Sequence, residues 1–320
     1  MPNSNQLQKA KGQEPRVKGQ FKAYLLKRGC SNRTVKTYIH DVTMFFQWAE
    51  GKHIAMDFAT YSDMLEYTQY LRNQQLLPTT VKGYFKGLNH YFDYLIQAQQ
   101  HTENPARYLN LQGKKHRTLY HLLSPEQLEG LYTHFDTNSK RRTKLSARAS
   151  AHCKKVMVGL MIFQGLDIHA MAALSVRDLD LDKGTIQVPS SRIQAERILT
   201  LRSTQMMELY RYADTLRAEL LQHFPLDTEK APDQLLIFGS GKYAHINAFK
   251  RLLDRLKEQE PALTSSRQIK ASVITHWLRQ YNLREVQYMA GHRNVKNTEA
   301  YLRDDTQDLK ADIDRFHPFG

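Results

Sequence analysis

Apolar side chains recur at helical spacing in four consecutive segments of the first hundred residues, and this pattern constrains the fold more than any other feature. The repeats start at about Phe21, return over 35–46 and over 61–73, and continue after Pro78. Residues that recur every three or four positions line one side of a helix, where they can be buried together. The pattern therefore predicts a small bundle of four helices.

The chain is strongly basic: 46 lysines and arginines stand against 32 aspartates and glutamates, which gives a formal net charge of +14. Such an excess is typical of proteins that bind nucleic acid, because each neutralised phosphate releases counterions. A basic protein that merely stays soluble and one that lies on anionic lipid are the alternatives. The sequence contains no Lys/Arg-rich segment with a broad apolar face, so a membrane partner is not expected. The charge therefore predicts a nucleic acid as the partner.

The fourth helical segment carries a cationic stripe beside its apolar one. Lys82, Lys86 and His90 lie four residues apart and so stack along one face of the helix. A solvated helix face is the usual reason for such spacing. A helix laid against DNA, with its lysines on phosphates, is the other reading, and the net charge of the chain favours it.

Composition divides the chain into four parts. Residues 1–16 are polar and predict a flexible tail, and residues 17–110 hold the helical, DNA-binding bundle. Residues 111–122 are basic and lack an apolar period, so they predict a linker. The linker cations predicted to contact DNA are Lys114, Lys115 and Arg117. Residues 123–320 predict a second domain.

The second domain mixes helical and strand patterns. The run Ser124-Pro125-Glu126-Gln127 has the spacing of a capping box and predicts the start of a helix. A hydrophobic helix follows over about 153–164, then two short strands over 185–188 and 197–201, then mainly helices. The expected class is mainly α (α+β), with an N-terminal helical bundle and a C-terminal mixed helical domain that contains a small antiparallel sheet.

Cysteine, histidine and apolar runs exclude several classes of protein. Cys30 and Cys153 lie far apart and do not predict a disulfide framework, so the protein is expected in the reducing cytoplasm. The first residues have no apolar core of a signal peptide, and the longest apolar run, 156–163, is too short to cross a bilayer. The 14 histidines include no metal-ligand spacing on one helix face, and no Cys/His zinc cluster occurs, so no metal is expected.

Several runs, in chain order, resemble the tyrosine site-specific recombinases, the phage integrase family. They are Thr79–Val81, Tyr91–Leu95 and Glu103–Pro105 for the core-binding domain, Leu160–Ile168 and Leu174–Asp180 for the opening of the catalytic domain, and Met289–Tyr301 for the Gly-His…Tyr segment. The resemblance covers roughly residues 18–305. It implies two domains that close as a clamp around duplex DNA.

The resemblance also implies a defined chemistry. In this family a tyrosine hydroxyl attacks a DNA phosphodiester and forms a 3′-phosphotyrosyl link, which a DNA 5′-hydroxyl later reverses. Two arginines and a histidine hold the non-bridging oxygens, and a lysine on a β-hairpin protonates the leaving oxygen. No cofactor is implied, because the phosphotyrosine conserves the energy of the broken bond.

Carried over position by position, the nucleophile is Tyr301 and the family's last histidine is His292. The family's His-x-x-Arg helix start reads Arg267-Gln268-Ile269-Lys270, and the hairpin lysine falls near Arg192. The resemblance therefore implies a catalytic set of Tyr301, His292, Lys270, Arg267 and Arg192.

Both of the family's arginines are among the positions that have changed. Its Gly-Leu-Arg run reads Gly165-Leu166-Asp167, and the acidic residue three positions on is Ala170. A carboxylate near a phosphate repels it unless a neighbour neutralises it, and Asp167 could pair with Arg267 or Lys270 as a structural salt bridge. Loss of one charge-stabilising donor costs about 10²–10³ in rate. The sequence therefore predicts impaired or rearranged strand transfer, with an active recombinase and a non-catalytic accessory protein as the alternatives.

The segment after Tyr301 predicts a short amphipathic helix, because Leu309, Ile313 and Phe316 recur at helical spacing. In the family such a helix packs on a neighbouring subunit. The resemblance therefore implies a homo-oligomer, or a complex with a partner recombinase, assembled on DNA in the nucleoid.

Overall fold

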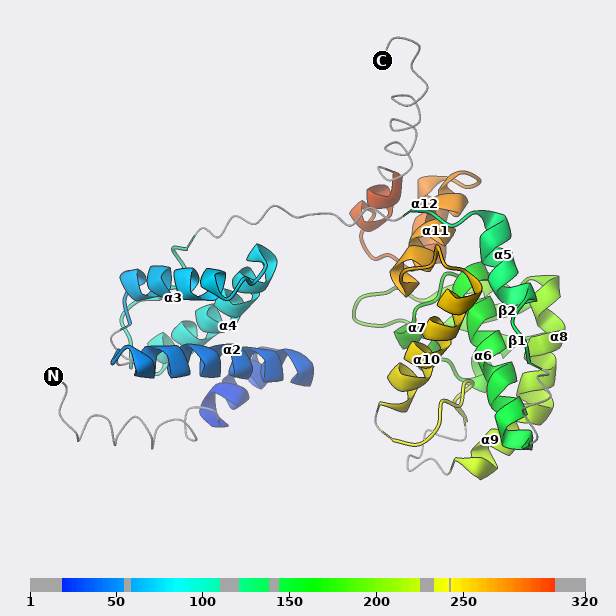
Figure 1. The fold of residues 1–320 in the computed structure, drawn as a ribbon, viewed down its shortest axis with the longest axis horizontal. Coiled ribbons are helices and arrows are strands. Elements are labelled where there is room, and N and C mark those ends of the chain that lie inside the picture. The colour runs from blue at the N-terminus through cyan, green and yellow to red at the C-terminus, as the bar shows by residue number, and fades with distance from the viewer. Residues whose placement is uncertain are drawn as a thin grey trace, which may run out of the picture. The chain divides into compact units, whose positions relative to one another are not determined.

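The fold is seen in a computed structural model, which divides the chain into two compact units, Met1–Arg117 and Thr118–Gly320 (Figure 1). The structure describes residues 19–54, 59–109, 121–137, 144–224, 233–241 and 243–302. The predicted N-terminal tail, most of the predicted linker with Lys114, Lys115 and Arg117, and the predicted C-terminal assembly helix lie outside the described residues.

The N-terminal unit is the predicted bundle of four helices. A helix that includes residues 19–27 is followed by α2 (Asn32–Gly51), α3 (Tyr61–Asn73) and α4 (Pro78–Gln97). Their apolar faces meet in one core, which includes Phe21, Leu25, Phe45, Tyr67, Leu88 and Phe92. The helical spacing in the sequence therefore arises from the burial of one side of each helix.

The C-terminal unit is mostly helical and holds one small sheet. Its helices are α5 (Pro125–Thr133), α6 (Leu145–Phe163), α7 (Ile168–Ala172), α8 (Ser203–Arg211), α9 (Arg217–His223), α10 (Ala244–Gln259), α11 (Ser266–Leu278) and α12 (Leu283–Ala290). A short 3₁₀ turn, η2 (Val176–Asp178), precedes the sheet, and a π-helical turn, η3 (Tyr212–Leu216), joins α8 to α9. The capping box at Ser124 is confirmed, because Ser124 N donates to Gln127 Oε1 and Gln127 N donates to Ser124 Oγ.

The sheet has three antiparallel strands in the order β1 (Leu179–Asp180), β2 (Thr185–Val188) and β3 (Arg197–Thr200). Ile186 pairs with Leu199, and both point into the core. The two predicted strands are confirmed. The two residues of β1 are too few for a period-two pattern to reveal them.

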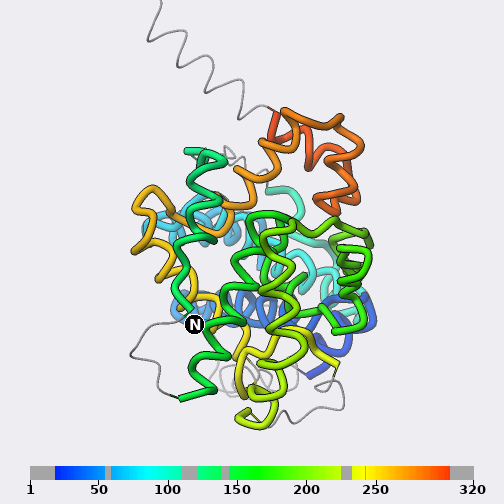
Figure 2. The backbone as a smooth tube through the Cα atoms, turned by 90° about the vertical axis from the view of Figure 1, so that its right-hand side faces the viewer, coloured from blue at the N-terminus to red at the C-terminus, as the bar shows by residue number. Residues whose placement is uncertain are grey.

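Helix α6 lies at the centre of this unit, with α5, α8, α9 and α11 packed around it (Figures 1 and 2). It begins at Leu145, eight residues before the predicted start, because cations such as Arg148 interrupt the apolar pattern of its first turns. After α6 the chain turns at Gly165 (φ +61°), where a Cβ would lie 3.0 Å from the Trp277 ring. This turn brings Asp167 to the start of α7.

Within the residues that the structure describes, no helix is both long and apolar enough to cross a membrane.

A carboxyl group is buried between two helices of the N-terminal unit. Asp41 on α2 is 5% exposed and lies against Gly87 of α4. Its Oδ2 accepts no hydrogen bond from any described residue, and the titratable groups near it are the hydroxyls of Tyr38 and Tyr67. Burial raises the pKa of Asp41 to about 7. The unit therefore keeps a proton on Asp41 in mildly acidic solution.

Asp41→Asn is expected to raise the free energy of unfolding at pH 8 by about 1–3 kcal/mol, because it removes the cost of a buried carboxylate. Folding raises the pKa of this group, so its penalty is full above the raised pKa and shrinks as the pH falls toward the unfolded value. The gain should therefore be smaller at pH 5 than at pH 8, and urea denaturation at the two pH values measures it.

Glu50→Gln is the control for this measurement, because Glu50 is exposed on the same helix. Its effect should stay below about 0.5 kcal/mol. A gain from Asp41→Asn of the same size at both pH values would contradict a buried, protonated carboxyl group.

Candidate active site

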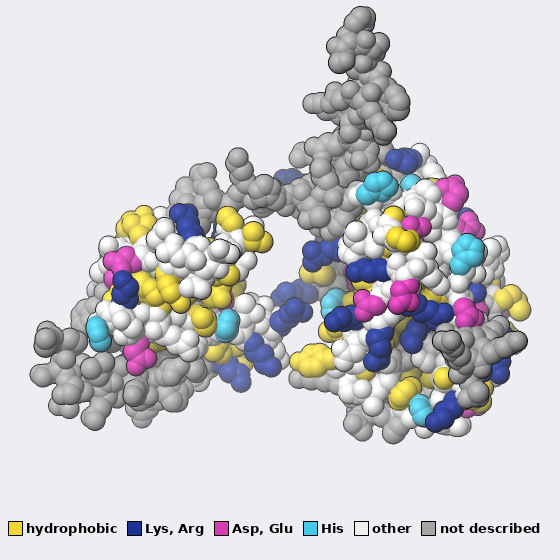
Figure 3. All heavy atoms as spheres, in the orientation of Figure 1, with side chains coloured by type: hydrophobic (Ala, Val, Ile, Leu, Met, Phe, Trp, Pro, Cys, Tyr) yellow, Lys and Arg dark blue, Asp and Glu magenta, His cyan; other side chains and the backbone are white. Residues whose placement is uncertain are grey.

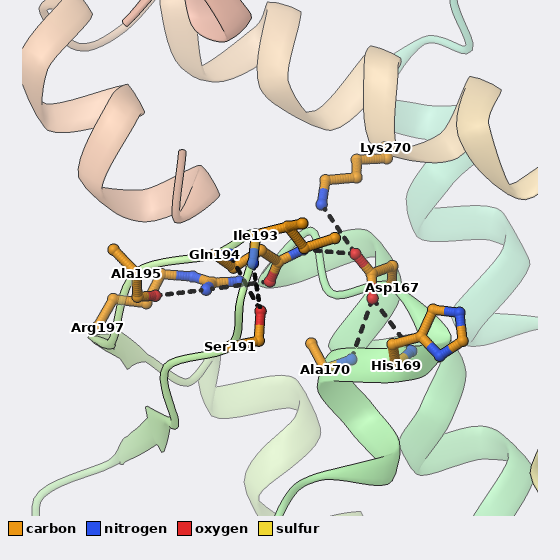
Figure 4. Close-up of polar contacts among 9 residues, drawn as sticks. All are labelled: Asp167, His169, Ala170, Ser191, Ile193, Gln194, Ala195, Arg197 and Lys270. Atoms are coloured by element: carbon orange, nitrogen blue, oxygen red, sulfur yellow. Dashed lines mark hydrogen bonds and ion pairs between the residues drawn. The ribbon is translucent and has the colours of Figure 1, made fainter. Parts of the chain in front are cut away.

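The carboxylate of Asp167 joins three parts of the C-terminal unit (Figure 4). Its Oδ1 caps α7 by accepting from the backbone N–H groups of His169 (3.1 Å) and Ala170 (3.0 Å). Its Oδ2 accepts from Lys270 Nζ on α11 (3.3 Å) and from Gln194 Nε2 in the β2–β3 loop (2.6 Å). Both oxygens of the carboxylate are therefore occupied by protein groups.

Electrostatics keep the Asp167–Lys270 pair ionised. The side chains are 33% and 19% exposed. Burial pushes the pKa of Asp167 upward, but Lys270 and the hydrogen bonds from Ala170 and Gln194 outweigh it and hold the pKa below its usual value. Burial lowers the pKa of Lys270, and Asp167 opposes this shift. Of the two partners predicted for Asp167, the structure therefore selects Lys270, whereas Arg267 is exposed at the start of α11.

The β2–β3 loop is attached to the segment that follows α12. Gln194 and His292 form an isolated antiparallel bridge, and Ala195 N donates to Gly291 O (2.9 Å). Arg293 Nη2 donates to Ser191 O (2.8 Å). Between these attachments the loop presents Arg192, whose side chain is exposed. The loop that carries the predicted hairpin cation is thus held against the predicted histidine segment.

His292 and Tyr301 lie side by side. Helix α12 ends at Gly291 in the left-handed conformation, and the chain then turns so that His292 Nδ1 lies 2.9 Å from Thr298 Oγ1. The rings of His292 and Tyr301 are parallel within 3°, with centroids 6.0 Å apart. Burial, aided by the charges of Lys270 and Arg197, lowers the pKa of His292 to about 4. The imidazole is therefore neutral at neutral pH.

Arg197 belongs to this neighbourhood and was missed by sequence reasoning. It is the first residue of β3 and is 1% exposed, on the same side of the strand as Leu199. Burial lowers the pKa of Arg197 to about 10, so the guanidinium is still charged at neutral pH. The period-two alternation of β3 was the signal that would have found it, because it places Arg197 inward with the apolar residues.

Three of the five predicted catalytic residues come together, namely Lys270, His292 and Tyr301. Lys270 and Arg197 both act on the charge state of His292, and the Tyr301 ring packs against the small cluster of Ile274, Val286 and Ala290 between α11 and α12. Arg192 and Arg267 are exposed on the β2–β3 loop and on the first turn of α11. The roles of all five residues stay predictions.

The predicted DNA-contacting stripe of α4 is only partly exposed. Lys82 and Lys86 are exposed. The His90 ring is half-buried and stacks on Tyr38 with centroids 5.0 Å apart, and burial followed by the charge of Arg28 lowers the pKa of His90. On the C-terminal unit, Figure 3 shows Lys and Arg side chains over a broad part of the visible face.

The fold and this constellation define the class of the protein. Residues 121–308 match the family described as Phage integrase family, and residues 19–102 match the family described as Phage integrase, N-terminal SAM-like domain. The chain therefore belongs to the phage integrase family, as the sequence motifs predicted.

Individual relatives cover nearly the whole chain. Tyrosine recombinase XerD of Oceanobacillus iheyensis is 26% identical over 298 residues, which are 92% of this chain and 95% of the relative. Among solved structures, the XerH recombinase bound to its difH substrate in a pre-cleavage complex has a TM-score of 0.62 at 14% identity, over 94% of this chain and 87% of that one. A lambda integrase dimer bound to a COC′ core site has a TM-score of 0.59 at 12% identity, over 89% and 76%. These structures share the fold.

Two substitutions separate the two roles of Asp167. Asp167→Asn keeps a capping oxygen and removes the ion pair, so it should lower the free energy of unfolding by about 1–2 kcal/mol, because Lys270 loses its counter-charge. Asp167→Ala also removes the cap and should cost about 1 kcal/mol more. Denaturant unfolding at neutral pH measures both losses.

The matched control is Asp180→Asn, which removes the exposed ion pair of Asp180 with Lys183 (2.9 Å). Its loss should be smaller than that of Asp167→Asn, because solvent screens an exposed ion pair. An Asp167→Asn loss no larger than that of the control would contradict a stabilising role for the Asp167–Lys270 pair.

Proposed function

We propose that this chain is a DNA-binding protein of the tyrosine recombinase type that acts in DNA recombination or integration, with impaired strand-transfer chemistry. The observation that carries the proposal is the ion pair between Asp167 Oδ2 and Lys270 Nζ at 3.3 Å. The proposed partner is double-stranded DNA in the nucleoid, bound by a homo-oligomer or together with a partner recombinase. Family membership and the basic charge of the chain support this role.

The ion pair bears directly on strand transfer. In the reaction Tyr301 Oη would give up its proton and form a bond to phosphorus. The bond from phosphorus to the DNA 5′ oxygen would break, and that oxygen would take up a proton. Extra negative charge develops on the non-bridging oxygens and needs cationic donors. Here one arginine position of the family holds Asp167, and the lysine at the other is neutralised by it. A lysine also lacks the planar fork with which arginine binds two phosphate oxygens.

An active recombinase is the second candidate, and the contact between His292 and Tyr301 favours it. If the Thr298 hydroxyl donates to Nδ1, the neutral imidazole keeps its proton on Nε2 and can donate to a phosphate oxygen. Arg192 would supply a further cation from the β2–β3 loop. The third candidate is an accessory protein that binds DNA for a separate recombinase and does not cut it.

Covalent trapping on a nicked suicide substrate separates these candidates. The substrate is the duplex that the protein selects from a random library, nicked in turn at each position. We expect a Tyr301-dependent adduct to be absent, or to form about 10² times more slowly than with a relative that keeps both arginines. The measurement is the yield of covalent complex on a denaturing gel, with Tyr301→Phe as the blank.

A gain-of-function variant sharpens this test. Asp167→Arg combined with Lys270→Arg restores the family's two arginines and should raise the adduct yield about tenfold or more. A wild-type yield equal to that of the intact relative would refute the impairment and leave the active recombinase. If neither the wild type nor the double variant forms an adduct while both still bind DNA, the result would favour the accessory role.

The α4 stripe should contribute to DNA binding through phosphates. Lys82→Ala combined with Lys86→Ala is expected to weaken binding to all duplexes alike and to reduce the slope of log K against log salt by about 2, because two counterions fewer are released. Fluorescence anisotropy at several salt concentrations measures the slope. Lys52→Ala is the control, since Lys52 is paired with Glu66 at 3.4 Å. An unchanged slope in the double variant would exclude the stripe from the interface.

A further inference from the structure

Arg197 is buried without a full set of partners. Its Nη1 donates to Gln194 Oε1 (3.4 Å) and to Ala195 O (3.2 Å), two neutral acceptors of the β2–β3 loop. Its Nε and Nη2 donate to no described residue. A cation this deeply buried is costly unless it is paired or does something else for the protein. Its own contacts therefore do not account for its position.

The guanidinium is packed against the backbone of Gly291. It lies against the Cα of Gly291, so that a Cβ added there would lie 2.7 Å from Arg197 Cζ. Gly291 also has φ +69°, a left-handed conformation that favours glycine. Two independent constraints thus select glycine at this turn, its backbone conformation and the guanidinium packed on it.

Gly184 shows what the backbone constraint requires by itself. Its φ is +63°, close to that of Gly291, but nothing lies within 4 Å of a Cβ added there. Of these two glycines, only Gly291 has a side chain packed against it.

The guanidinium also reaches the residue after the turn through its charge. With burial as the first cause, Arg197 contributes to the low pKa of His292 and to that of Lys270. The strand that carries it is fixed to α12, because Ile198 N donates to the Tyr288 hydroxyl at 2.8 Å. Arg197 therefore lies between the β2–β3 loop, α12 and the His292 turn.

We propose that Arg197 is a positioning residue that holds the Gly291–His292 turn in place beside Tyr301, through the packing of its guanidinium on Gly291 and the nearness of its charge to His292. The role belongs to the candidate site and so rests on its proposed function. Arg197 acts through His292 and need not touch DNA.

A double-mutant cycle tests the packing. Gly291→Ala should lower the melting temperature of the full chain by about 5 °C more than Gly184→Ala, because only the first substitution forces a methyl group against the guanidinium. Methionine is shorter than arginine and uncharged. In an Arg197→Met background the two alanine substitutions should therefore lower the melting temperature by nearly the same amount. Differential scanning calorimetry measures all four variants and their backgrounds.

The titration of His292 tests the charge, which a purely structural residue would not affect. NMR signals of the histidine rings, assigned with His292→Asn, should show His292 neutral down to about pH 5 in the wild type. In Arg197→Met its titration should move to higher pH by about half a unit or more. Arg197→Lys keeps the charge and should restore the wild-type titration.

Either of two results would overturn the proposal: an unchanged His292 titration in Arg197→Met, or an equal excess cost of Gly291→Ala with and without Arg197. Both measurements use the protein without DNA. A failure to bind or cut DNA would therefore count against the proposed function and leave this test intact.

Discussion

The hydrogen bonds of one carboxylate hold the candidate site together. Asp167 caps α7 with one oxygen and binds α11 and the β2–β3 loop with the other, so three elements far apart in the sequence share a single anchor. Asparagine and aspartate are both good N-caps, but only a carboxylate also compensates a partly buried ammonium group. An arginine at this position would leave the cap and Lys270 without their partner. The aspartate therefore joins these elements while it offsets the positive charge of Lys270.

The remaining charge is distributed unusually for a site that is expected to grip phosphate. The charge of Lys270 is compensated by that of Asp167, and His292 is neutral because it is buried. Arg197 is charged but buried next to the turn at Gly291. Exposed cations lie on the β2–β3 loop, as Arg192 does, and on the first turn of α11, as Arg267 does. Electrostatic catalysis depends on donors already aimed at the developing charge, and exposed side chains must first be ordered. This arrangement is the basis of the proposal that strand transfer is impaired.

Much of the fold could be predicted from the sequence, whereas the site could be predicted only in part. The bounds of α3, the capping box at Ser124 and strand β2 follow from local spacing, because burial of one face and capping leave periodic marks. The start of α6 was placed too late, since Arg148 masks the apolar period there. Motifs brought His292 and Tyr301 to notice, and charge logic named Lys270 as a partner of Asp167. Arg197 carries no motif, and its importance arises from packing against Gly291, a contact between residues 94 positions apart.

The attachment of the β2–β3 loop has a mechanical consequence. Its backbone is bonded to residues 291–293, and its tip exposes Arg192 and Ile193 to solvent. A molecule that binds the tip and displaces it would therefore also displace residues 291–293, because the two segments are hydrogen-bonded to each other. The exposed tip of the loop and the His292 turn beside Tyr301 are therefore directly connected.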